Sequence, residues 1–133
     1  MPLTRITVPR HLSSAKIRAL ASAAHEGLVE TCGVPIDDLF QVLQRVDAED
    51  LIMHPTFGGV NRSADACIIE INFLVGRSDD QKRQLFRHIA EKAATAGIRV
   101  DDVMVALSEN SRMDWSVGKG VAYADHVASK REV

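Results

Sequence analysis

The second residue of the chain is a proline, Pro2, which directly follows Met1 and leads into the strand-like run 3–8. A small second residue favours removal of Met1 by aminopeptidase, and the chain would then begin with a secondary amine held in a ring. A free α-amine titrates near neutrality, at about 7.7–8.0, so its surroundings decide whether it is a base or a cation. Pro2 is therefore a candidate catalytic amine, although proline also occurs at this position in proteins without such chemistry.

Two acidic pairs stand at matching places in the sequence. Asp37 and Asp38 follow the turn-forming run 33–35, and Asp101 and Asp102 follow the corresponding glycine-led run. A carboxylate beside an α-amine favours its protonated form and can hold a substrate or a water molecule. Turn and capping roles explain such acidic pairs equally well, so the residues alone leave both interpretations open.

The acidic pairs belong to an internal repeat with an offset of 64 residues, from 33 to 97. Residues 33–39 recur as residues 97–103, and Ser14 falls on Ser78. Each half predicts a strand, a long helix closed by glycine, an acidic turn and a second strand. The expected strands are 3–8, 39–46, 66–75 and 103–107, and the expected helices begin at Ser13 or Ser14 and at the capping box Ser78 to Gln81.

Two tandem β-α-β units predict an α+β fold, in which two long helices cover one face of a four-stranded sheet. We expect a single domain over residues 1–133, with halves at about 2–46 and 66–107 and a tail at 109–133. Only that tail is left to cover the second face of the sheet, so the pattern predicts an oligomer. A ferredoxin-like monomer with a chance repeat is the alternative.

Composition and charge exclude several classes of partner. With a net charge of −2 and a pI of about 6.2, the chain has no basic patch for nucleic acid or for an anionic membrane surface. No apolar run is long enough to span a membrane and the N-terminus lacks a secretory pattern, so we expect a cytoplasmic protein. Cys32 and Cys67 are expected to be buried free thiols, and the histidines show no ligand spacing that predicts a metal site.

The ordered set of motifs resembles the tautomerase superfamily. It consists of Pro2 at the head of the first strand, followed by the segments 32–35, 38–41, 77–82, 101–110 and 114–120. Within the superfamily the resemblance is greatest to the malonate semialdehyde decarboxylases, and it spans residues 2 to about 120. It implies a tautomerase-like homotrimer, a proline at the mouth of a pocket near subunit boundaries, and no metal or organic cofactor.

The resemblance also assigns roles to residues of this chain. Pro2 and Asp38 would be the catalytic pair, and Trp115 would form an aromatic wall, although a lone tryptophan more often packs in a core. Arg77 stands just before the helix start, where its guanidinium and free backbone N–H groups could bind a substrate carboxylate, unless it is only a solvated residue. Tyr123 in the tail would donate its hydroxyl to the substrate or fix the tail in place.

The predicted function is a cofactor-independent decarboxylase acting on a small 3-oxo acid, with Pro2 as the cationic electrophile. One alternative is a tautomerase or hydratase of 2-oxo acids, with Pro2 as general base. Another is a catalytically silent trimer with a binding or structural role. This last alternative arises because the position of the family's first arginine is apolar here, and Gly76 displaces Arg77 by one residue.

Overall fold

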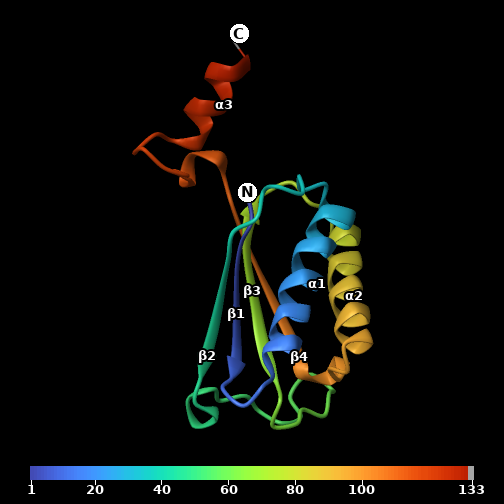
Figure 1. Ribbon diagram of the computed structural model, residues 1–133. Coiled ribbons are helices and arrows are strands. Elements are labelled where there is room, and N and C mark those ends of the chain that lie inside the picture. Colours follow the sequence, from blue (N-terminus) through green and yellow to red (C-terminus); the bar gives the residue numbers. More distant parts are fainter. Residues whose placement is uncertain (132–133) are drawn as a thin grey trace.

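Figure 1 shows the computed structural model, which describes residues 1–131; the last two residues of the predicted tail, 132–133, lie outside it. A four-stranded sheet carries two long helices, packed side by side on one of its faces (Figure 1). The predicted α+β fold is therefore confirmed. The elements are β1 (Leu3–Pro9), α1 (Ser14–Cys32), β2 (Gln41–Val46), β3 (Cys67–Leu74), α2 (Asp79–Thr95), β4 (Val103–Asn110) and α3 (Tyr123–Arg131).

The strand order is β2-β1-β3-β4, with parallel pairs inside each half and an antiparallel pair where the halves meet. Leu3 at the start of β1 pairs with Asn72 near the end of β3. One end of the sheet, called the proline end below, therefore gathers the starts of β1 and β2 and the ends of β3 and β4. The opposite end, where β1 and β2 end and β3 and β4 start, is called the far end.

The strand ends differ from the sequence prediction by one residue at β1 and at each end of β3, and by more at β2 and β4. β4 continues past residue 107 to Asn110, because β3 supplies partners for it: Phe73 pairs with Glu109 and Leu74 with Asn110. Backbone pairing does not depend on the polarity of the side chains, so the polar end of β4 still forms strand. β2 begins at Gln41 rather than at residue 39, and a turn at residues 36–37 precedes it.

Local sequence signals set the helix ends. The Ser13 hydroxyl accepts a hydrogen bond from the Lys16 amide, and Ser78 forms a full capping box with Gln81. α1 ends at Gly33 in the left-handed conformation, with φ of 69°. The helices approach closely at Gly27, where a Cβ would lie 3.0 Å from Leu85 Cδ1. The core between helices and sheet is made of buried aliphatic side chains and Phe73, among them Ile6, Val8, Ile17, Leu20, Leu28, Ile69, Ile71, Leu85 and Ile89.

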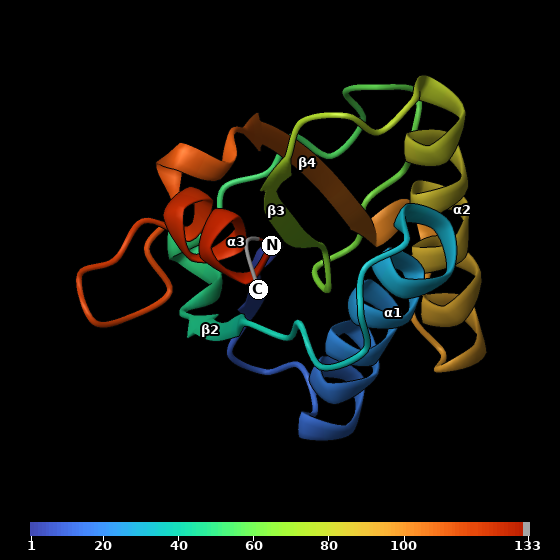
Figure 2. The same cartoon turned by 90° about the horizontal axis from the view of Figure 1, so that it is seen from above.

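The second face of the sheet carries no helix, and its side chains are exposed or only partly buried. They include Val42, which is 40% exposed, Met104, which is 44% exposed, and the charged residues Arg5 and Glu70. The tail does not cover this face. It leaves the sheet at the proline end and carries α3 beyond it (Figure 1), and in the view from above α3 lies on the other side of the strands from α1 and α2 (Figure 2).

The internal repeat extends further than the sequence motifs indicated. A short 3-10 turn follows the second strand of each half, at Ala48–Asp50 and at Arg112–Asp114, again 64 residues apart (48 to 112). Beyond these turns the two halves differ. The chain after the first turn connects to β3 at the far end, whereas the chain after the second turn leaves the sheet.

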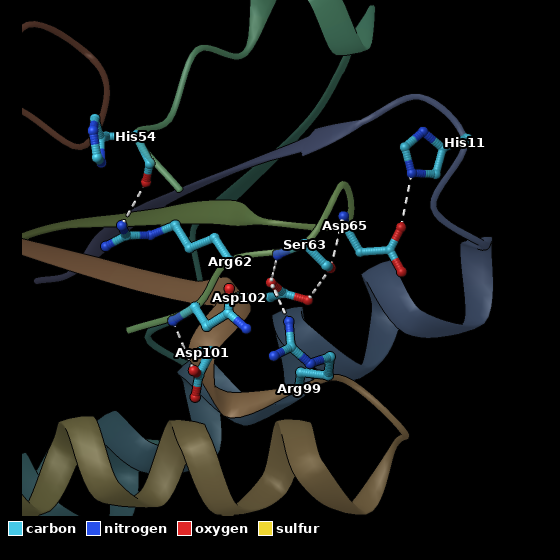
Figure 3. A network of polar contacts seen from close by, with 9 residues as sticks. His11, His54, Arg62, Ser63, Asp65, Arg99, Asp101 and Asp102 are labelled. Carbon is cyan, nitrogen blue, oxygen red and sulfur yellow. Dashed lines mark hydrogen bonds and ion pairs between the residues drawn. The ribbon is translucent and has the colours of Figure 1, made fainter. Parts of the chain in front are cut away.

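Asp102, the last residue before β4, has a buried carboxylate whose contacts lie at the far end (Figure 3). It accepts hydrogen bonds from the Ser63 amide at 2.7 Å and the Ser63 hydroxyl at 2.6 Å, and it pairs with Arg99 Nη1 at 3.3 Å. Burial, together with the charge of Asp102, raises the pKa of the Cys67 thiol to about 12. Cys67 is therefore an uncharged core residue at neutral pH, and the Asp102 cluster serves to join the start of β3 to the start of β4.

Replacing Asp102 by alanine is expected to lower the free energy of unfolding by about 2–4 kcal/mol, because it removes three hydrogen bonds that converge on a buried carboxylate. Urea unfolding followed by circular dichroism measures the loss. Asp101→Ala is the matched control, since this neighbour accepts one bond, from the Asn61 amide at 2.9 Å. Equal losses in the two variants would contradict a special structural role for Asp102.

Candidate active site

The proline end brings an α-amine and a carboxylate together. The Met1 nitrogen lies 3.1 Å from Asp38 Oδ2, and the Asp38 side chain is only 16% exposed. Pro2 itself is buried. While Met1 is attached, the Pro2 nitrogen belongs to an amide and is not basic. Removal of Met1 would transfer the amine to Pro2, at the head of the same strand.

The second oxygen of Asp38 completes this arrangement. Oδ1 is buried and has no hydrogen-bond partner among residues 1–131. A buried carboxylate oxygen without a donor is costly, and its usual partners are a bound molecule or an ordered water. The geometry can therefore hold a protonated amine on one oxygen and a substrate or water on the other.

Comparison of the two halves separates the function of Asp38 from that of Asp102. The two residues are repeat equivalents, 64 positions apart (38 to 102). At the far end, all the contacts of Asp102 are made to Ser63 and Arg99 of the same chain. At the proline end, Asp38 instead faces an α-amine and keeps one oxygen free. The sequence could not distinguish the pairs, and of these two residues only Asp38 lies beside the α-amine.

The loop that carries Asp38 is hydrogen-bonded to α1. His25 Nε2 donates to the Ile36 carbonyl at 2.7 Å, and the Asp38 amide donates to the Pro35 carbonyl at 3.0 Å. Since a carbonyl only accepts, the proton lies on Nε2 of His25. Sequence reasoning missed this residue, because His25 and Ile36 are 11 positions apart and meet only when the loop folds back on the helix.

Arg77 lies at the proline end, on the helix-bearing face of the sheet. Its guanidinium stacks over the Phe73 ring, with 5.2 Å from Cζ to the centroid. Phe73 follows the residue that pairs with Leu3, so the register places it opposite Pro2. Arg77 is also committed to the backbone, because Nη1 donates to Leu74 at 2.8 Å and Nη2 to Cys32 at 3.4 Å.

A second carboxylate near Arg77 was not recognised from the sequence. Glu109, on β4 beside Phe73, forms an ion pair with Lys82 of α2. The hydrogen bond from Lys82 holds the pKa of Glu109 below its usual range, with further contributions from the Gly76 amide and from the charge of Arg77. Glu109 therefore balances the positive charge of Arg77 and Lys82, which weakens their attraction for a substrate anion.

Trp115 and Tyr123 lie in the tail, beyond the end of the sheet. The Trp115 indole nitrogen donates to Asn110 Oδ1 at 2.6 Å, and the Trp115 carbonyl accepts from the Tyr123 amide at 2.8 Å. The Tyr123 ring neighbours His126, with 6.5 Å between centroids. The structure thus fixes the two aromatic residues relative to each other, and it records no hydrogen bond or ion pair from either side chain to Pro2 or Asp38 within the described chain.

The doubled β-α-β sheet is the tautomerase fold, since solved structures of that fold superpose on nearly the whole chain. A family model described as "Tautomerase enzyme" matches residues 38–118 of the chain. The chain belongs to the tautomerase superfamily and is an enzyme of that superfamily. No helix of the described residues is both long and apolar enough to cross a membrane.

Individual relatives cover nearly the whole chain. The "Probable tautomerase YusQ" of Bacillus subtilis (strain 168) is 30% identical over 92% of this chain and 97% of its own length. The crystal structure of FG41 malonate semialdehyde decarboxylase, inhibited by 3-bromopropiolate, is 35% identical with a TM-score of 0.87 and covers 96% of both chains. A symmetric trimer of fused 4-OT, at 22% identity and a TM-score of 0.74, covers 92% of this chain and 96% of its own and shares the fold.

Proposed function

We propose that this enzyme is a cofactor-independent decarboxylase of a small 3-oxo acid, of the type of malonate semialdehyde. The observation that carries the proposal is the α-amine beside Asp38, whose second oxygen is buried and unpartnered. The likeness to FG41 malonate semialdehyde decarboxylase, at 35% identity over nearly the full length, supports the substrate class.

In this proposal the Pro2 amine acts as a cation. Asp38 is its counter-ion and favours the protonated form. The bond between the substrate carboxylate and the α-carbon breaks, CO₂ leaves, and the electron pair passes into an enolate that ends on the carbonyl oxygen. The Pro2 ammonium donates a hydrogen bond to that oxygen as its charge grows. A proton then adds to the α-carbon and completes the aldehyde or ketone product.

The proposal includes a homotrimer with sites near subunit boundaries. The sheet face that carries Val42 and Met104 is uncovered in the single chain, and apolar side chains on such a face favour burial against another copy. The symmetric trimer of a protein with the same fold supports three copies as the assembly.

A second candidate function is the tautomerisation or hydration of a 2-oxo acid, with unprotonated Pro2 as general base. The observation that favours it is that the matching relatives from Bacillus subtilis carry the name tautomerase. The same geometry serves both reactions, because the charge of the amine selects between them.

Parallel assays of malonate semialdehyde and phenylpyruvate test the proposal, with intact-mass measurement to verify that Met1 is absent. We expect CO₂ release from malonate semialdehyde and much slower turnover of phenylpyruvate. Turnover of phenylpyruvate alone would favour the tautomerase. If the processed protein acts on neither compound, the decarboxylase proposal is wrong and a binding or structural role gains support.

A further inference from the structure

The far end of the sheet contains a cavity of about 350 Å³, formed where the chain after the first 3-10 turn meets the start of β3. It is largely apolar, with a single arginine in its wall. The lining residues are Pro9, Ala48, Leu51, Met53, Pro55, Arg62, Ser63, Ala64 and Ala66. The internal repeat allows this cavity to be compared with the space around Pro2.

Adding or subtracting 64 maps this lining onto the proline end of the sheet. Ala66 corresponds to Pro2 (66 to 2), so the far-end cavity surrounds the counterpart of the catalytic amine. The other counterparts include two cations and three side chains of aromatic or aliphatic type. They are Arg112 for Ala48, Lys119 for Pro55, Phe73 for Pro9, Trp115 for Leu51 and Val117 for Met53.

Up to the 3-10 turns, the two halves share strands, helices and turns at nearly the same offset, so residues of this part that share a cavity in one half should have counterparts near one another in the other. Ala48 and Ala66 line one cavity, so the repeat predicts that Arg112 and Pro2 lie around one pocket, although the cavity that Arg112 lines in the single chain does not include Pro2. Phe73, the counterpart of Pro9, does lie near Pro2, because the strand register sets the two residues opposite each other.

Arg112 also has the surroundings expected of a ligand-binding arginine: it lines a cavity and its guanidinium has no recorded partner among the described residues. It is the first residue of the second 3-10 turn and is exposed. It lines a cavity of about 430 Å³ at the proline end, together with Leu74, Val75, Asn110 and Ser111. Its guanidinium has no side-chain hydrogen bond or ion pair to any other part of residues 1–131 that the structure records. Arg77 and Lys82, by contrast, are engaged by backbone carbonyls and by Glu109.

We propose that Arg112 is the residue that binds the substrate carboxylate, and that it determines specificity for small 3-oxo acids. This inference rests on the proposed function for the identity of the substrate. The free guanidinium offers a planar pair of N–H donors that matches a carboxylate. The substrate then spans from Arg112, which holds its carboxylate, to the Pro2 ammonium, which holds its carbonyl oxygen.

The direction in which charge moves during the reaction predicts whether replacing Arg112 changes KM or kcat. During decarboxylation the negative charge leaves the carboxylate and passes to the carbonyl oxygen, so Arg112 binds the substrate at least as well as the transition state. Such binding appears in KM rather than in kcat. Arg112→Gln is expected to raise KM by about 10- to 100-fold with kcat changed less than about threefold.

Two further variants sharpen the kinetic test. Arg112→Lys keeps the charge without the planar fork and is expected to show an intermediate KM. Arg87→Gln is the matched control, because this exposed arginine on α2 is absent from the lining of either cavity and its KM should stay at the wild-type value. A wild-type KM in Arg112→Gln, or an equal rise in Arg87→Gln, overturns the inference.

Propanoate binding separates this inference from the decarboxylase proposal. Propanoate has the carboxylate without the oxo group, and the indole N–H signal of Trp115, the one tryptophan in the sequence, reports binding in NMR titrations. Saturable binding that is lost in Arg112→Gln and kept in Arg87→Gln supports Arg112 even if no 3-oxo acid is decarboxylated. Loss in Arg77→Gln with retention in Arg112→Gln assigns the carboxylate to Arg77 and overturns the inference, as does wild-type protein that binds no propanoate.

Discussion

Replacing Asp38 by asparagine is expected to lower kcat/KM for a 3-oxo acid by about 10²- to 10⁴-fold, the usual range for a lost acid–base partner. The amide cannot act as a counter-ion, so the α-amine loses the charge that favours its protonated form. Steady-state assays with the 3-oxo acid at a fixed neutral pH would measure the loss.

Asp37→Asn is the matched control for this prediction. Asp37 precedes Asp38 in the same loop and is exposed, and no ion pair to it is recorded among the described residues. It should retain wild-type activity. Unfolding in urea provides a second check, because Asp38→Asn should be at least as stable as wild type, whereas Asp102→Ala should not. An active Asp38→Asn enzyme would remove Asp38 from the catalytic pair.

Replacing Pro2 by alanine is expected to lower kcat by about 100-fold, although a small second residue still permits removal of Met1. A primary amine rotates freely about its bond to the chain, whereas the proline ring fixes the direction of the N–H bonds. A displacement of about 1 Å in a reacting group can cost about 10²-fold in rate. The rate of CO₂ release at saturating substrate measures this loss.

Two controls make the Pro2 result interpretable. Intact mass must show that Met1 is absent from both proteins, since a retained methionine moves the amine by one residue. Pro9→Ala changes the proline at the other end of the same strand and should leave kcat unaltered. A Pro2→Ala enzyme with kcat within about threefold of wild type would refute the role of the ring amine.

Much of the fold could be predicted because its signals are local. Capping at Ser13 and Ser78 and the stop at Gly33 each depend on residues within one or two helical turns. The repeat supplied the long-range information, since two β-α-β units can form a common sheet in few ways. The length of β4 was underestimated because its polar end is held by pairing with β3.

The candidate site was harder to predict because it depends on contacts between distant parts of the chain. The two acidic pairs look alike in sequence, and only the surroundings of Asp38 and Asp102 distinguish an open carboxylate from a satisfied one. Arg77 occupies the predicted place, but its engagement with the Cys32 carbonyl depends on how α1 ends. The position of Arg112 cannot be predicted from local sequence, because the short 3-10 turns carry no motif that would align them.

The difference between the two ends of the sheet has a consequence for engineering this protein. Enzymes commonly trade stability against activity, because a reactive site needs groups that are not fully satisfied. Here the unsatisfied carboxylate is confined to one end, while its counterpart, Asp102, is fully bonded at the other. Substitutions that fill the far-end cavity around Ala66 should therefore raise the melting temperature without slowing catalysis.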